Sequence, residues 1–398
     1  MLNAISKHYL HYKHLPHRLL YKGITLFLRP VMRIIKTSFT YIILLLAVQS
    51  TQAQTITWPS PEVEQMYNQA REQNARGNLR GAITLYQQAL QIAPDIMVLH
   101  RELGKAYSLA GANKEAQKVL EPIVKSGDAD EQTYQALGSS YYGSGDYRKA
   151  KSTFEAGVER FPHSGIIYNA WGKMYDEDKQ PEEALKTYIK GIEADPGYHL
   201  NYYEAAQSYM GTNKPVWAIL YGEIFINMEQ QTTRSHETRA MLIRAYHRLF
   251  NAIARTDIPR YGKKKNENEA TNGFEDAVYN TYIKLSPVVA DGLTTENLTM
   301  LRARFLMDWY LTYAQKYPFT LFQRQDELIR DGYFDIYNQW LFGKAENVAQ
   351  YEAWNKFHPD AMPDMEEWLK ENRFMPAAAD AYNTGDVNGI FLKKDNKR

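Results

Sequence analysis

The chain has 398 residues, of which 44% are hydrophobic, so it is long enough for two or three domains or for one repeat array with an attached module. It contains no Cys, which excludes disulfides, thiolate metal sites and cysteine nucleophiles. Residues 1–53 hold seven Lys/Arg and no Asp/Glu, which leaves 40 basic against 46 acidic residues afterwards, and this mildly acidic body lacks the basic stripe of a nucleic-acid-binding surface.

Residues 1–53 are interpreted as an N-terminal extension plus a secretory signal peptide. The apolar run at 39–48 (FTYIILLLAV) is short for a membrane span of about 20 residues, and small residues follow it at a cleavage position. Translation from Met32 would give an ordinary basic leader, and the TQA/Q ending resembles exported proteins of the Bacteroidota. We therefore expect a periplasmic or otherwise exported protein. If the segment stays uncleaved, it would anchor the chain in the inner membrane.

From residue 54 to 232 the chain repeats itself at a constant spacing. Tyr134 and Gly138 in one copy match Tyr168 and Gly172 in the next, and a proline closes both copies. Five copies in register begin at Val63, Met97, Glu131, Gly165 and His199. A glycine at the matched position lets two helices approach closely, so a larger side chain there would overpack by about 1–3 kcal/mol.

This pattern of aromatic, small and proline positions resembles the tetratricopeptide repeat. The resemblance covers residues 63–230 and implies an all-α fold, a right-handed superhelical solenoid of about five helix pairs. The fifth copy departs from the pattern, with Gly222 at a position that usually holds a large residue and Gln230 in place of the closing proline.

In this family the concave groove is lined by the second, fifth, ninth and twelfth positions of each first helix, and it binds peptides or partner helices. Transferred to this chain, the resemblance implies a polar, partly basic groove that contains several tyrosines. The candidate binding residues are Tyr67, Arg71, Arg101, Lys105, Tyr142, Asn169, Lys173, Tyr203 and Gln207. Gln135, Ser139 and Asp176 occupy further groove positions. Exposed basic contacts would make binding sensitive to salt.

Three further segments follow the repeats. Residues 233–273 predict a helix at 233–254, either a worn sixth repeat or a capping helix, and then an exposed polar loop. Residues 274–386 predict an aromatic-rich helical domain, and 387–398 a flexible tail. Twelve of the 44 residues from 299 to 342 are aromatic, and their helical spacing favours a core packed against the last repeats over a ligand platform.

No residue pattern predicts catalysis, a metal site or a cofactor. The histidines after residue 53 have no metal-ligand spacing. Asp326, Glu327, Asp331 and Asp335 lie close together in sequence, but Arg324 and Arg330 are interspersed, as on ordinary charged helix surfaces. An enzyme at Asp331 would require a cleft and a raised carboxyl pKa.

We interpret the chain as a non-enzymatic protein-interaction scaffold of the cell envelope that binds a protein or peptide partner in the concave groove, with no nucleic acid involved. The alternative is a glycan- or peptide-binding protein that uses the aromatic C-terminal domain. That alternative requires several of Trp309, Tyr310, Trp340 and Trp354 to be exposed together.

Overall fold

The computed structural model describes residues 57–255, 273–383 and 385–392, and these residues form helices joined by turns. The chain divides into two compact units, 1–60 and 61–398, and only residues 57–60 of the first are described. The predicted signal peptide and most of the predicted polar loop lie outside the described residues. All helices below belong to the second unit.

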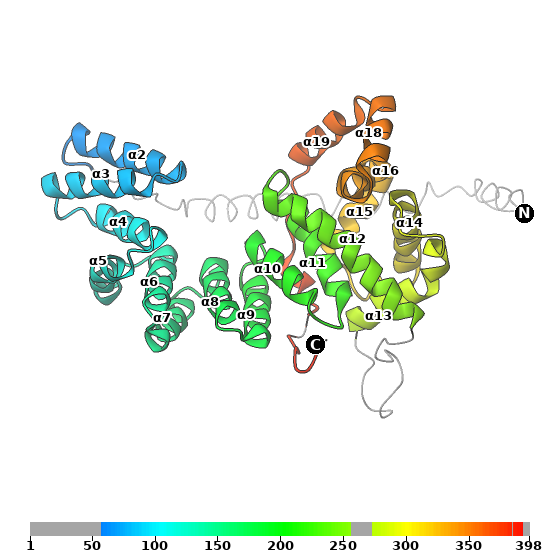
Figure 1. Cartoon of the computed structure of the whole chain (residues 1–398), viewed down its shortest axis with the longest axis horizontal. Helices are drawn as coiled ribbons and strands as arrows, with labels where there is room; N and C mark the ends of the chain where they lie inside the picture. The colour runs from blue at the N-terminus through cyan, green and yellow to red at the C-terminus, as the bar shows by residue number, and fades with distance from the viewer. Residues whose placement is uncertain (1–56, 256–272, 384, 393–398) are drawn as a thin grey trace, which may run out of the picture. The chain divides into compact units, whose positions relative to one another are not determined.

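Residues 61–228 form five successive helix pairs, coloured blue to green in Figure 1. The pairs are α2 (Pro61–Ala75) with α3 (Leu79–Ile92), α4 (Met97–Leu109) with α5 (Asn113–Ser126), α6 (Glu131–Gly143) with α7 (Tyr147–Arg160), α8 (Gly165–Glu177) with α9 (Pro181–Ala194), and α10 (His199–Tyr209) with α11 (Pro215–Met228). The first helices of pairs two to five begin at the constant spacing of the sequence repeat, as do all five second helices. The all-α fold and the repeat register predicted from the sequence are confirmed.

Glycine and an aromatic ring meet where the helices of a pair cross. A Cβ atom on Gly138 would lie 2.4 Å from the Cε1 atom of Phe154, and one on Gly172 would lie 2.3 Å from the Cε1 atom of Tyr188. Both rings are completely buried, so neither can swing aside into solvent. The matched small and aromatic positions are therefore a packing requirement of each pair.

The fifth pair is complete despite its departures from the pattern. Gly222 faces α12 (Thr233–Ala254), and a Cβ atom there would lie 2.9 Å from side-chain carbons of both Met241 and Leu242. A large residue at this position would occupy the space that α12 fills. The fifth repeat therefore has Gly222 at this position because α12 packs directly against it.

Helix α12 begins one repeat spacing after α10, where the first helix of a sixth repeat would start. Thr232 and Ser235 form a capping box at its N-terminus. Its 22 residues continue through the point at which a second helix would begin. It therefore occupies a repeat position but is a single long helix packed on the fifth pair.

The C-terminal module follows α12 and shares a core with the last repeats. Its helices are α13 (Gly273–Leu285), η1 (Ser286–Val289), α14 (Thr295–Thr312), α15 (Thr320–Arg330), α16 (Phe334–Asn338), η2 (Gln339–Gly343), α17 (Lys344–Glu346), α18 (Val348–Phe357), α19 (Ala361–Glu371) and η3 (Ala378–Asp380). One cluster of buried apolar residues extends from Ala184 in α9 to Ile390 near the chain end. The aromatic segment forms a packed core, as its helical spacing predicts.

A buried ion pair joins the fifth repeat to this module. Glu223 of α11 and Arg302 of α14 are both 2% exposed, and the Arg302 guanidinium donates a hydrogen bond to Oε1 of Glu223. Gln325 Nε2 donates to the same oxygen at 2.8 Å, and the Tyr337 hydroxyl does so at 2.9 Å. Burial, together with the charge of Glu223, raises the pKa of Tyr337. The network therefore surrounds the Glu223 carboxylate with one cation and two neutral hydrogen-bond donors.

The chain end is anchored as far as Leu392, which corrects the prediction of a flexible tail from 387. Val387 and Ile390 are buried, at 0% and 7% exposure. The Leu392 amide donates to the Gly211 carbonyl at 3.0 Å, and the Asn213 amide donates to the Ile390 carbonyl at 2.9 Å. Apolar residues within a mostly polar ending are what hold it, since they fill space beside the fifth repeat. Residues 393–398 lie outside the described part.

Candidate functional site

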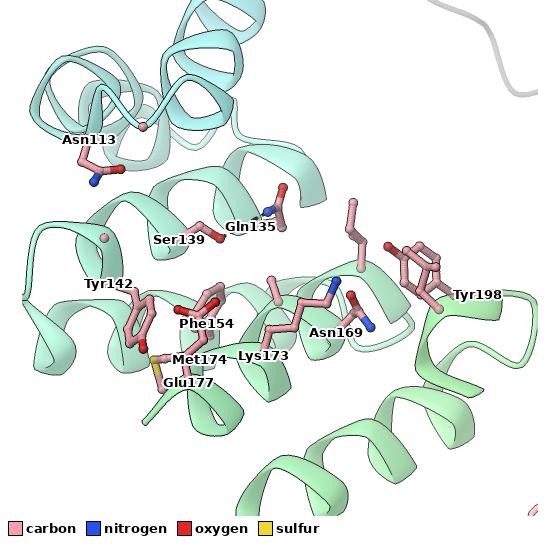
Figure 2. Close-up of a pocket in the computed structure, with 15 residues that line it drawn as sticks. Asn113, Gln135, Ser139, Tyr142, Phe154, Asn169, Lys173, Met174, Glu177 and Tyr198 are labelled. Carbon is pink, nitrogen blue, oxygen red and sulfur yellow. Dashed lines mark hydrogen bonds between the residues drawn. The ribbon is translucent and has the colours of Figure 1, made fainter. Parts of the chain in front are cut away.

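A hollow of about 500 Å³ lies between the third and fourth repeats, at the groove positions of their first helices (Figure 2). Helix α6 contributes Gln135, Ser139 and Tyr142, and helix α8 contributes Asn169, Lys173 and Glu177. Apolar atoms of Phe154, Ile166, Ala170, Met174 and Leu200 also line it. The hollow therefore combines amide, hydroxyl and charged groups with apolar surface.

Three of the nine predicted binding residues, Tyr142, Asn169 and Lys173, line this hollow together. Figure 2 shows Gln135 and Ser139 on one helix across from Asn169 and Lys173 on the next. Gln135 Nε2 donates to Ser139 Oγ at 3.2 Å, which orients the amide along the groove. The transferred groove positions thus converge in repeats three and four.

Asn169 is a fixed part of this hollow and has little exposed surface. It is 4% exposed, and its Nδ2 donates to Oδ1 of Asn201 at 3.3 Å. Asn201 is fully buried, and its own Nδ2 donates to the Gly165 carbonyl at 3.0 Å. Asn201 is not among the residues predicted from the sequence, although a polar residue inside a helix-pairing segment is a signal that could have identified it.

Three of the four predicted groove cations, Arg101, Lys105 and Lys173, are paired with carboxylates, which corrects the prediction of a partly basic groove. Lys105 Nζ lies 3.1 Å from Asp130 and 3.2 Å from Glu102, and its side chain is only 11% exposed. Arg101 lies 3.9 Å from Asp130. Lys173 Nζ lies 3.1 Å from Oε1 of Glu204 in the next repeat. The positive charge that the sequence suggests is therefore neutralised locally.

The same pairs connect successive repeats. Asp130 caps α6 by accepting from the Thr133 amide at 2.7 Å while it binds Lys105 of the preceding repeat. Although burial opposes ionisation, hydrogen bonds from Thr133 and the charge of Lys105 lower the pKa of Asp130. Lys105 therefore supports the stacking of repeats two and three and is not a free binding group.

Carboxyl groups near the fourth repeat are held in a less polar environment. Burial raises the pKa of Glu204 even though Lys173 is close, and it also raises the pKa of Asp176, which accepts a hydrogen bond from Tyr188 at 2.7 Å. Together with Glu177 these carboxyl groups outnumber the nearby groove cation, Lys173.

Four other predicted residues lie away from the hollow. Tyr67 is 9% exposed and packs on the ring of Tyr86 at 6.3 Å, with the Arg71 guanidinium 5.7 Å from the Tyr67 ring. Tyr203 packs against Phe225 at 5.0 Å. Gln207 is half-buried in the same helix. These residues belong to the first and fifth repeats, so the structure does not bring them together with Tyr142 and Lys173.

The aromatic residues required for a ligand platform are not exposed together. Trp309 is 1% exposed and lies in the module core. Trp340 is half-buried, with the Arg239 guanidinium 4.4 Å from its ring, and Trp354 stacks on His358 at 4.7 Å. These contacts give the three tryptophans packing roles, whereas Tyr310 is 42% exposed.

The acidic residues around Asp331 also have structural partners. Asp331 accepts a hydrogen bond from the Trp368 indole at 3.1 Å, and Asp326 pairs with Arg330 at 3.0 Å. Within the described ranges, no cluster of three or more His, Asp or Glu residues has the arrangement of a metal site.

Two family models described as tetratricopeptide repeat match the chain, one over residues 73–140 and the other over 136–199. Residues 73–199 are tetratricopeptide repeats. Repeats of this kind imply a protein-interaction scaffold and suggest protein or peptide partners, and such scaffolds are generally non-enzymatic. No curated protein sequence matches the chain.

Several solved structures are similar to the tetratricopeptide array. TTC0263, a thermophilic TPR protein in Thermus thermophilus, has 15% identity and a TM-score of 0.40, with 46% of this chain and 99% of that chain covered. The pilF protein of Pseudomonas aeruginosa has 17% identity and a TM-score of 0.39, covering 48% and 88%. YrrB, a TPR protein with an unusual peptide-binding site, has 18% identity and a TM-score of 0.30, covering 44% and 90%.

Proposed function

We propose that the chain is a scaffold of the cell envelope that binds a polar peptide segment of a partner protein in the hollow between α6 and α8. The observation that supports this most is the convergence of Gln135, Ser139, Tyr142 and Lys173 from adjoining repeats around one cavity of about 500 Å³. Side-chain amides and hydroxyls can both donate and accept, so they suit the backbone of an extended peptide. The apolar lining suits one of its side chains.

The ion pairs in the groove indicate which kind of peptide it would bind. Because Arg101, Lys105 and Lys173 each have a carboxylate neighbour, an acidic peptide would compete with groups already in place. Hydrogen bonds and side-chain packing then supply most of the affinity. Partner binding should therefore depend less on salt concentration than binding to a groove of unpaired basic residues would.

Blocking the hollow is expected to abolish partner binding. In Ser139→Tyr a bulky ring would project from α6 into the cavity, whereas Ser152→Tyr places the same ring on the exposed face of α7 in the same repeat. Each variant would be used to recover partners from extracts of the native organism, with quantitative mass spectrometry. We expect at least a tenfold loss for Ser139→Tyr alone. Equal recovery by the two folded variants would move the binding site elsewhere.

Export is the second part of the proposal, and it rests on the apolar run at 39–48 and the small residues that follow it. In the part of the chain that the structure describes, no helix has the length and apolarity of a membrane span. We expect the mature protein to lack residues 1–53 and to be periplasmic.

Mass spectrometry of the N-terminal peptide of the native protein checks this expectation. A mature chain that begins near Gln54 is expected. A retained Met1 or Met32 would contradict cleavage and favour the form anchored in the inner membrane.

A further inference from the structure

Helix α14 carries apolar residues on two opposite faces. Its inner face buries Leu298, Leu301, Phe305, Leu306 and Trp309. On the outer face Met300, Met307 and Leu311 are 46%, 66% and 83% exposed. At about 100° per residue these three side chains fall within about 40° of one another. The three side chains lie along one side of the helix, and together with Arg304 we call them the outer stripe.

The outer stripe has a polar rim. On the side of α13, Lys284 Nζ pairs with Asp308 at 2.7 Å. On the side of α15, Tyr310 lies near the ion pair of Asp326 with Arg330. An apolar centre within a polar rim is the usual anatomy of a protein interface. Methionine side chains are flexible and polarisable, so they can adapt their shape to the side chains of a partner helix.

Arg304 distinguishes among the molecules that could cover this surface. It lies on the same face as Met300 and Met307, it is exposed, and no described residue forms a hydrogen bond or ion pair with it. A cation in the middle of an apolar stripe needs a carboxylate opposite it when the surface is covered, since an unpaired charge is costly to bury.

We propose that the outer stripe of α14 is a docking site for an amphipathic helix of a partner protein that carries an acidic residue between its apolar residues. From Met300 to Leu311 the stripe extends for about 16 Å, which matches three turns of such a helix. This site lies on the C-terminal module and is separate from the groove hollow, so a single chain would join two partners.

A second copy of the chain fits this surface less well. Antiparallel pairing about the midpoint of the stripe would place the two Arg304 residues about 5 Å apart along the axis. Asp308 is the one carboxylate between Met300 and Leu311, and it is already paired with Lys284, so it does not offset that repulsion. A lipid surface is also less suited, because Asp308 and Asp326 are paired with Lys284 and Arg330, so the flanks of the stripe carry no net positive charge to attract anionic headgroups.

A charge-swap experiment on the full chain tests the proposal. The probes are two fluorescent synthetic helices of four turns with leucines along one face, identical except for a central Glu in one and Lys in the other. Fluorescence anisotropy should show the Glu peptide binding at least tenfold tighter. Arg304→Glu should reverse that preference, while Arg373→Glu, an exposed arginine elsewhere on the module, should leave it unchanged.

Four outcomes would overturn the proposal. Failure of both peptides to bind, or a preference that survives Arg304→Glu, removes the acidic helix as the occupant. A dimer in sedimentation that Met307→Glu abolishes would assign the stripe to a second copy. Flotation with vesicles of phosphatidylcholine and phosphatidylglycerol that is lost in Met307→Glu would assign it to lipid. Peptide binding that persists in Ser139→Tyr shows that the result is independent of the groove.

Discussion

Replacing Glu223 with alanine is expected to lower the free energy of unfolding by about 3–5 kcal/mol, because Arg302 would remain charged and buried without a counter-ion. Arg302 is 2% exposed, and Gln325 and Tyr337 would lose the acceptor they share. The damage should concentrate at the junction of α11 with α14, so urea should separate the C-terminal module before the first three repeats. Tryptophan fluorescence reports this transition, since Trp217 and Trp309 lie in the shared core.

Two controls separate the buried charge from a general loss of contacts. The double variant Glu223→Leu with Arg302→Leu removes both charges, so it should recover most of the stability lost in Glu223→Ala. Asp326→Ala breaks the surface pair with Arg330, whose side chain is 66% exposed, and should cost less than about 1 kcal/mol. Similar losses for the buried and the surface variant would show that Glu223 is not the anchor of the junction.

Gly172→Leu is expected to destabilise the repeats by about 1–3 kcal/mol through overpacking. Its Cβ atom alone would lie 2.3 Å from the Tyr188 ring, which is fully buried and also held by a hydrogen bond to Asp176. Lys173→Leu is the matched control, because the neighbouring residue points to the groove with 48% of its side chain exposed and loses only a partly solvated ion pair. Equal melting temperatures would mean that the helix register is wrong.

The repeat register could be predicted because its determinants are local and periodic. Gly138 and Phe154 belong to the two helices of one repeat, and the same pairing recurs in the next repeat as Gly172 with Tyr188. Each copy therefore supports the interpretation of the next. The fifth copy was harder to recognise from the sequence, because Gly222 makes room for α12, which lies outside the repeat.

The binding surface was predicted less completely, for a reason visible in Lys105. Its residue type and position mark it as a groove cation, but its partner Asp130 comes from the next repeat, 25 residues later. Nothing in a single sequence indicates that pairing. The ion pair of Glu223 with Arg302 is still harder to predict from the sequence, since the two residues are 79 positions apart and belong to different modules.

Because the chain end packs beside Gly211, we expect the first repeats to fold before the last repeats during synthesis. Repeats one to three make their contacts with neighbours close in sequence, so they can form as soon as they emerge. Repeats four and five share their core with Val387 and Ile390, so their packing must wait until almost the whole chain is available. A chain interrupted before residue 387 would therefore carry an incompletely covered core, and its last repeats would be the part that chaperones must protect.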